Sequence, residues 1–184
     1  MTAMKPNKAR TDLLMDLGLV AFLIALDVVA RLVPHAPGFV PIAASALFAG
    51  RVLRIPALAP VVPVAAMVLS ALALGPDDWR VALIGTVAIS LPAFVGIVSR
   101  RWPGIPATAA VMVACSLVFF ALSNLAYWAF SGTYSPDLEG LTQCYIAALP
   151  FLQNTVAGDL FWTAVLFGAA WAIQNGAMLA GRAR

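Results

Sequence analysis

Two apolar runs joined by one short basic turn decide the fold: residues 81–130 read VALIGTVAISLPAFVGIVSRRWPGIPATAAVMVACSLVFFALSNLAYWAF. As an α-helix, each run is long enough to cross a hydrocarbon core of about 30 Å. The turn carries Arg100 and Arg101, and a basic turn of this kind is typical of a cytoplasmic loop. Residues 81–99 and 107–130 are therefore predicted to be two transmembrane helices joined on the inside.

The same alternation of charge extends along the rest of the chain. The basic gaps between apolar runs hold Lys5, Lys8 and Arg10, then Arg51 and Arg54, then Arg100 and Arg101, then Arg182 and Arg184. The gaps between these hold Asp77 and Asp78, then Asp137 and Glu139. Because cytoplasmic loops retain Lys and Arg, both termini are predicted to lie inside. We expect a single all-α domain, residues 1–184, with six transmembrane helices at 13–33, 39–53, 57–74, 81–99, 107–130 and 159–180.

The composition supports this class of protein. The 184 residues are 62% hydrophobic and only 10% charged, with a mean hydropathy of +0.95, whereas soluble domains carry about 25% charged residues. The net charge of +3 comes from basic residues at the ends of the predicted helices and not from a basic patch, so no nucleic-acid partner is expected. The single histidine excludes a metal site built from several imidazoles. With no H-E-x-x-H or C-x-x-C motif and no evident catalytic constellation, we expect neither an enzyme nor a cofactor.

Residues 131–158 form the longest segment that is not predicted to span. The segment begins with a loop, SGTYSP, and residues 137–152 have helical spacing but are too short and polar to cross a membrane. We expect this segment to be an outer lid that lies on, or dips into, the outer face.

Polar and aromatic side chains gather in the outer half of the predicted bundle. Asn124 lies within a spanning helix, so its amide needs either a partner on another helix or a ligand. For the tyrosines and tryptophans, the alternative is an interfacial aromatic belt. Cys144 is either a buried small side chain or a soft ligand to a metal-containing substrate such as a corrinoid. The predicted substrate-binding residues are Asn124, Trp128, Tyr134, Gln143, Tyr145, Asn154 and Asp159, with Arg31 and His35 at the rim.

The first predicted helix carries further polar and small residues. Asp27 and Arg31 are one turn apart and can form an ion pair, although either one could instead face a ligand. Asp16 lies nearer the inner surface, where it can snorkel or pair with the basic N-terminus. A stripe of small residues allows close helix packing, either within the bundle or with another membrane protein. Its members are Gly18, Ala21 and Ala25.

Three stretches resemble a family of small bacterial membrane proteins that carry only a general transport-protein label. They are RLVPHAPGFVPIAA at 31–44, SNLAYW at 123–128 and GLTQCYIAALPFLQNT at 140–155. That family is similar to the substrate-binding S components of energy-coupling factor (ECF) vitamin transporters. The resemblance implies six helices, a vitamin or metal ion bound near the outer face, and docking through small residues of the first helix. The docking partner would be a shared membrane subunit that carries two ATPases.

We therefore predict a multi-pass transport protein of the bacterial inner membrane. It would capture a small, vitamin-like organic solute at the outer face, surrounded by lipid and served by a membrane coupling subunit with ATPases. The alternative is a non-transport scaffold or assembly subunit, in which the same polar outer residues contact another chain.

Overall fold

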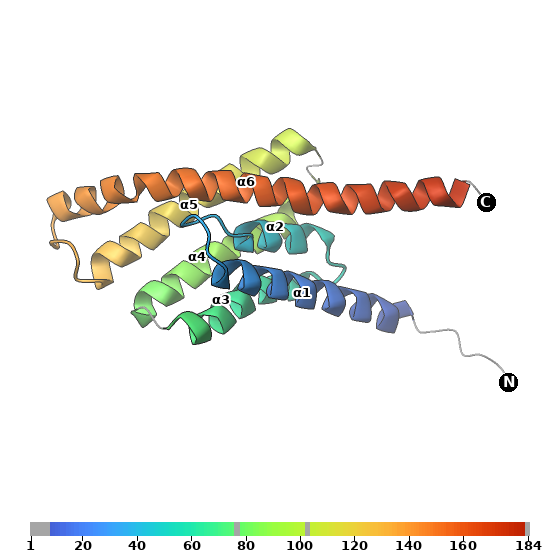
Figure 1. The fold of residues 1–184 in the computed structure, drawn as a ribbon, viewed down its shortest axis with the longest axis horizontal. Helices are drawn as coiled ribbons and strands as arrows, with labels where there is room; N and C mark the ends of the chain where they lie inside the picture. Colours follow the sequence, from blue (N-terminus) through green and yellow to red (C-terminus); the bar gives the residue numbers. More distant parts are fainter. Residues whose placement is uncertain (1–7, 76–77, 102–103, 183–184) are drawn as a thin grey trace.

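The computed structural model describes residues 8–75, 78–101 and 104–182, which form a bundle of six α-helices (Figure 1). Helices make up 85% of the structure, and the described residues contain no strand. The helices are α1 (Lys8–Leu32), α2 (Ile42–Val52), α3 (Val61–Leu74), α4 (Trp79–Val98), α5 (Ile105–Phe130) and α6 (Leu138–Arg182). Short 3₁₀ turns precede α3, at η1 (Pro56–Leu58), and follow α4, at η2 (Ser99–Arg101). The all-α prediction is confirmed.

Five of the helical segments are long and apolar enough to cross a membrane, which makes the chain a multi-pass membrane protein. They are Lys8–Leu32, Pro56–Leu74, Trp79–Arg101, Ile105–Phe130 and Leu138–Gly176. The remaining helix, α2, has 11 residues and a length of about 17 Å, too short to span alone. The described start of α1 and end of α6 point to the same end of the bundle (Figure 1).

Helix α2 is enclosed by the other helices rather than by lipid. Nine of its 11 residues are buried, and it packs most extensively against α4 and then α6. Small residues allow this close approach. A Cβ atom on Gly50 would lie 2.2 Å from the carbonyl oxygen of Ala93, and one on Gly96 would lie 2.5 Å from that of Leu47. The two glycines thus let the α2 and α4 backbones touch.

The predicted outer lid is wrong, because most of it is part of helix α6. Instead of a lid at 131–158 and a separate helix at 159–180, only residues 131–137 form a loop, and one helix of 45 residues follows. Pro150 lies inside this helix without ending it. At 1.5 Å per residue α6 is about 67 Å long, more than twice a hydrocarbon core. The polar residues that suggested a surface segment therefore belong to a helix that extends past the membrane core.

At one end of the bundle, which we call the closed end, arginine side chains form hydrogen bonds between the elements. This end comprises residues 50–60, 99–101 and 104–108, at the end toward which α2 and α4 run. Arg51 donates to Ser99 Oγ at 3.1 Å and to Thr108 Oγ1 at 2.5 Å. Arg100 donates to the carbonyl oxygens of Gly50 at 2.8 Å and Leu53 at 2.7 Å. The two Arg100 bonds satisfy carbonyl groups that the end of a helix leaves without partners.

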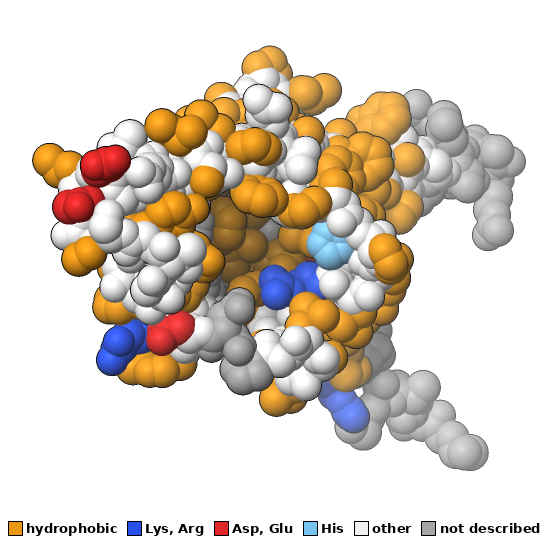
Figure 2. Space-filling model, turned by 60° about the vertical axis from the view of Figure 1, so that its left-hand side comes forward, with side chains coloured by type: hydrophobic (Ala, Val, Ile, Leu, Met, Phe, Trp, Pro, Cys, Tyr) orange, Lys and Arg blue, Asp and Glu red, His pale blue; other side chains and the backbone are white. Residues whose placement is uncertain are grey.

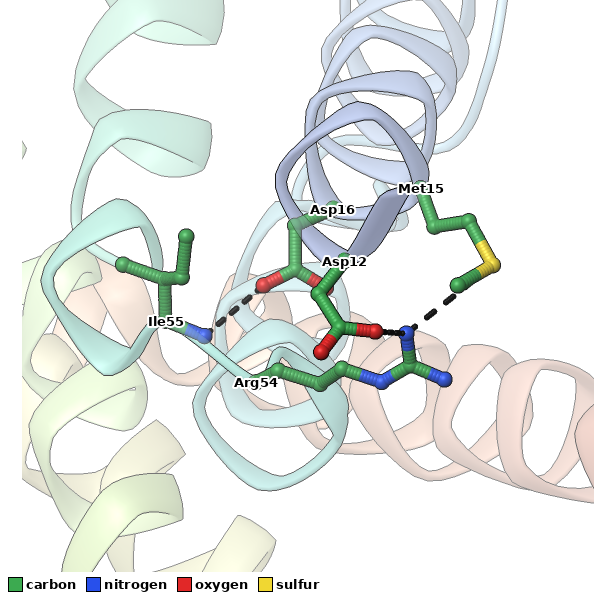
Figure 3. Close-up of polar contacts among 5 residues, drawn as sticks. All are labelled: Asp12, Met15, Asp16, Arg54 and Ile55. Carbon is green, nitrogen blue, oxygen red and sulfur yellow. Dashed lines mark hydrogen bonds and ion pairs between the residues drawn. The ribbon is translucent and has the colours of Figure 1, made fainter. Parts of the chain in front are cut away.

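The start of α1 is tied to the same end (Figure 3). Asp16 was predicted to snorkel or to pair with the basic N-terminus, but it is buried and accepts a 2.7 Å hydrogen bond from the backbone N–H of Ile55. Arg54 forms an ion pair with Asp12 and contacts the Met15 sulfur at 3.9 Å. Asp16 therefore holds the chain just before η1.

Candidate functional site

A cavity of about 310 Å³ lies at the opposite end of the bundle, which we call the open end. This end comprises the 33–41 loop and the ends of α1, α3 and α5. Figure 2 shows the hollow, with largely hydrophobic walls and with basic and histidine side-chain atoms beside it. The lining residues come from all six helices and the loop: Arg31, His35, Gly38, Val40, Ala43, Met67, Leu74, Gly85, Ile89, Phe119, Thr155 and Asp159.

Most of the cavity wall is apolar. Met67, Ile89 and Phe119 contribute side chains from three different helices. Gly85 contributes none, and a Cβ atom built on it would meet nothing within 4 Å. The space beside Gly85 is therefore part of the cavity and not a helix contact.

The 33–41 loop closes one side of the cavity by packing directly on α6. Gly38 has a φ of +82°, and a Cβ atom there would lie 2.4 Å from Thr155 Oγ1. One turn further along α6, a Cβ atom on Gly158 would lie 2.9 Å from the Cα atom of Phe39. Glycine is needed at both positions, because a side chain would push the loop away from α6.

Asp159 supplies the carboxyl group of the cavity. Asp159 is only 3% exposed, and its Oδ2 atom accepts a 2.6 Å hydrogen bond from Ser116 Oγ on α5. Among the described residues, no group donates to the other oxygen, Oδ1. Ile89 and Phe119 line the same part of the cavity, about three turns from the open-end termini of α4 and α5. We call this part the floor.

Two basic side chains, Arg31 and His35, mark the mouth of the cavity. Arg31 lies in the last turn of α1 and donates from Nη1 to the Met67 sulfur at 2.9 Å. The His35 Nδ1 atom lies 2.7 Å from the carbonyl oxygen of Val33. Because a carbonyl can only accept, Nδ1 carries the proton, and Nε2 is left for a ligand or solvent.

A second buried carboxyl group lies one turn before Arg31. Asp27 is fully buried, its Oδ1 atom accepts a 2.8 Å hydrogen bond from Ser45 Oγ on α2, and its Oδ2 atom has no hydrogen-bond partner. Arg31 attracts it electrostatically, and the ion pair between these two residues stays a prediction. Asp27 does not line the cavity, so it supports Arg31 from within the helix bundle.

Arg31, His35 and Asp159 are thus the predicted site residues that the structure brings together around the cavity. The other six do not line it: Asn124, Trp128, Tyr134, Gln143, Tyr145 and Asn154.

Most of these six side chains contact their own helix or join α5 to the start of α6. The Trp128 indole donates to the carbonyl oxygen of Ser135 at 3.0 Å, and the Tyr145 hydroxyl donates to that of Ala121 at 2.6 Å. The Asn124 amide donates to the carbonyl oxygen of Phe120, one turn back on its own helix, at 2.8 Å.

The remaining three lie on the loop and α6. The Tyr134 ring lies 6.3 Å from that of Tyr127. Gln143 is exposed and donates to Glu139 Oε1 at 3.3 Å, and Asn154 is half-buried on α6.

The two cysteines are free and buried. Cys144 lies 3.6 Å from the carbonyl oxygen of Asn124 and does not line the cavity, so it is placed as a packed side chain. In the part of the chain that the structure describes, no three His, Cys, Asp or Glu side chains are grouped to hold a metal ion. The predicted docking stripe of Gly18, Ala21 and Ala25 is exposed on α1.

The apolar walls were not found by sequence reasoning, because an apolar side chain in a membrane helix has the same pattern whether it faces lipid or a cavity. Ser116 and Ser45 could have been recognised from the sequence as partners of buried polar groups. Each is a hydroxyl within a spanning or enclosed helix, and each donates to a buried carboxyl group.

Comparisons with known proteins give one match. The model of a family described as "Family of unknown function (DUF6580)" matches residues 12–180. No curated protein and no solved structure matches the chain.

Proposed function

The chain belongs to this family of unknown function, and from its own geometry we propose that it is a membrane transport protein that captures a small organic solute in the open-end cavity. The protein would be of the S-component type, in the bacterial inner membrane, and would take up a vitamin-like solute from outside. The cavity is the observation that carries this proposal.

The cavity has the usual composition of a small-molecule site. Such sites measure about 300–1,000 Å³ and have mostly apolar walls with a few polar groups that orient the ligand. This one, at about 310 Å³, has apolar walls from several helices and polar groups at Arg31, His35 and Asp159. Its size suits a small organic molecule rather than a polymer.

The distribution of charge supports an outward-facing cavity. Arg51, Arg54, Arg100 and Arg101 lie at or beside the closed end, and basic residues mark the cytoplasmic side. The cavity mouth at the opposite end would then face the outside, where a solute arrives. Release to the inside would need a partner, and the exposed stripe of Gly18, Ala21 and Ala25 offers α1 as the surface for a coupling subunit with ATPases.

The test is native mass spectrometry of gently extracted protein, using two variants at one position. Gly85→Leu should fill the cavity, because Gly85 lines it and a Cβ atom there meets no protein atom within 4 Å. Gly85→Ala adds one methyl group and serves as the matched control. We expect a retained small molecule on the wild type and on Gly85→Ala, and none on Gly85→Leu.

The outcomes separate transport from the scaffold alternative. A ligand that stays bound to folded Gly85→Leu would contradict capture in this cavity. A stoichiometric protein partner, with no small molecule on the wild type, would favour a scaffold or assembly subunit.

A further inference from the structure

Resting on this proposed function, we propose that α6 forms the polar wall of the cavity and that the captured solute carries N–H or O–H donors along one edge, with an apolar body beside them. Two acceptor side chains on α6 support this assignment, Thr155 and Asp159, which are one turn apart and both line the cavity. The other polar side chains that the structure describes in the lining, Arg31 and His35, lie at the mouth on other elements.

The first acceptor is a carboxyl oxygen of Asp159. The side chain is almost completely buried, and its Oδ2 atom lies 2.6 Å from Ser116 Oγ. Among the described residues nothing donates to Oδ1, and this atom is not sealed inside the protein. Because Asp159 lines the cavity, a solute in the cavity can reach Oδ1.

The role of Oδ1 is the same whether Asp159 is ionised or carries a proton on Oδ2. In the second state Oδ2 donates to Ser116 Oγ, and the Ser116 hydroxyl donates in turn to the carbonyl oxygen of Met112, 3.0 Å away. In both states Oδ1 has lone pairs and no hydrogen. A solute group that meets this atom must therefore be a donor.

The second acceptor is the hydroxyl oxygen of Thr155. Its hydrogen is donated to the carbonyl oxygen of Phe151, one turn earlier on α6, at 2.9 Å. The Oγ1 atom therefore has only lone pairs left to offer. Because residues four apart on a helix have Cβ atoms about 5–6 Å apart, Thr155 and Asp159 form a short row of acceptors whose spacing is set by α6 alone.

The walls from the other helices offer apolar surface. Met67, Ile89 and Phe119 line the cavity from α3, α4 and α5, and Gly85 leaves open space beside them. A solute that is polar on every side would lose hydration against these walls without regaining hydrogen bonds. A purely apolar solute would leave the acceptors of α6 without donors. The cavity is therefore suited to a solute that is polar along one edge.

The test uses three probes with the same benzene ring and two substituents in meta positions. Resorcinol carries two O–H donors on one edge, 1,3-dimethoxybenzene keeps both oxygens without a donor, and 1,3-dimethylbenzene has neither. Equilibrium dialysis with the full-length protein in nanodiscs gives each Kd, and empty nanodiscs correct for partition into lipid. The change in each Kd between wild type and variant is compared, so that the different hydration of the probes cancels.

Two variants each remove one acceptor, Asp159→Leu and Thr155→Val. Each should weaken the binding of resorcinol about threefold to tenfold, the usual range for one hydrogen bond, and leave the other two probes unchanged. Asp159→Asn keeps a side-chain oxygen and should bind resorcinol more tightly than Asp159→Leu. The matched control is Thr163→Val, because Thr163 is buried one turn after Asp159 and does not line the cavity. This control should leave all three probes unchanged.

The contrary outcomes separate this inference from the proposed function. Resorcinol that does not bind wild type, or that binds both folded variants as tightly as wild type, would overturn the donor edge. So would a larger effect of Asp159→Leu on 1,3-dimethoxybenzene than on resorcinol. Should Asp159→Leu not fold, Thr155→Val decides, because it removes an oxygen bonded only to its own helix.

In each of these cases, loss of the native solute from Gly85→Leu would leave capture in the cavity standing. Resorcinol that binds folded Gly85→Leu as tightly as wild type would place its binding outside the cavity and overturn the donor edge. The proposed function fails only if the native solute is also retained by folded Gly85→Leu.

Discussion

The two ends of this bundle use the same residue type for different tasks. At the closed end, Arg51 and Arg100 donate to hydroxyl and carbonyl oxygens of neighbouring elements, at distances of 2.5–3.1 Å. At the open end, Arg31 lines a cavity of about 310 Å³ and donates to a methionine sulfur. Arginine side chains that bind helix ends fix the fold, whereas Arg31 brings a positive charge to the wall of the cavity.

Glycine shows the same contrast within a single helix. Near the closed end, Gly96 of α4 touches the α2 backbone, and nearer the open end, Gly85 of the same helix faces empty space. Close packing at one end and spare volume at the other are what a binding protein requires, because the site must be held by a rigid frame. The following predictions test this division, in order of decreasing effect.

Replacing each of the two glycines of α4, Gly85 and Gly96, by leucine should have opposite effects on stability and on ligand binding. In Gly96→Leu the new Cβ atom would lie 2.5 Å from the carbonyl oxygen of Leu47, so α2 and α4 must separate. We expect a loss of at least about 3 kcal/mol, or no folded protein. Gly85→Leu should remain folded and lose only the ligand. Fluorescence-detected size exclusion during thermal denaturation measures both, and equal stability of the two variants would contradict the contrast.

Methionine at two arginines should separate stability from binding. Arg100→Met removes the donors to Gly50 and Leu53 at the end of α2, and we expect a loss of about 2 kcal/mol in stability. Arg31→Met should cost less stability but should weaken retention of the captured solute, because Arg31 lines the cavity. Thermal denaturation and native mass spectrometry of both variants provide the comparison. A binding defect in Arg100→Met as large as that in Arg31→Met would show that the ends are not independent.

The sequence predicted the fold well wherever an apolar run has the length of the membrane core. Both ends of α4 and α5 lie within two residues of the predicted positions, because charged and turn residues stop such runs. Helix α3 ends at the predicted residue, Leu74, but begins at Val61, four residues after the predicted start, because the 3₁₀ turn η1 precedes it. Helix α6 was divided wrongly. Pro150 and the polar residues before it suggested a surface segment, yet a proline removes only one backbone donor, and an exposed helix tolerates polar side chains.

The site was less predictable, for a physical reason. Arg31, His35 and Asp159 stood out because ionisable groups are costly near a membrane core. Trp128 and Tyr145 are equally polar, but the Trp128 indole donates to the backbone of the loop between α5 and α6, and the Tyr145 hydroxyl donates to the backbone of α5. Polarity in a sequence shows that a group needs a partner and does not show whether the partner is a solute or the chain itself.

Alanine at two serines should distinguish a sealed carboxyl group from one that faces the cavity. Ser45→Ala removes the donor to Asp27, whose other oxygen already has no partner, and we expect a loss of about 1.5 kcal/mol. Ser116→Ala removes the donor to Asp159, but this carboxyl group can recruit water from the cavity, so we expect less than about 0.5 kcal/mol. Chemical denaturation of both variants measures the difference, and a larger cost for Ser116→Ala would reverse it.

The smallest effect should come from Asp137, which lies at the open end but outside the cavity. Its Oδ1 atom accepts from the backbone N–H of Gly140 at 2.7 Å and from Ser135 Oγ at 2.9 Å, and so caps α6. These bonds hold the pKa of the Asp137 carboxyl below its ordinary value. Its stabilising effect is therefore present above the unfolded pKa and is lost as the pH falls through the lower, folded pKa.

Asp137→Asn keeps a side-chain oxygen that can accept a hydrogen bond and removes the titration, so it is the matched control. The wild type should be slightly more stable near pH 7, and the difference in Tm should shrink as the pH falls below about 4, the ordinary range of an aspartate. Thermal denaturation from pH 7 to pH 3 checks this, together with native mass spectrometry of the retained solute, which should give the same result for both proteins. A constant difference in Tm, or a change in the retained solute, would show that the cap at 137 does not act locally on the start of α6.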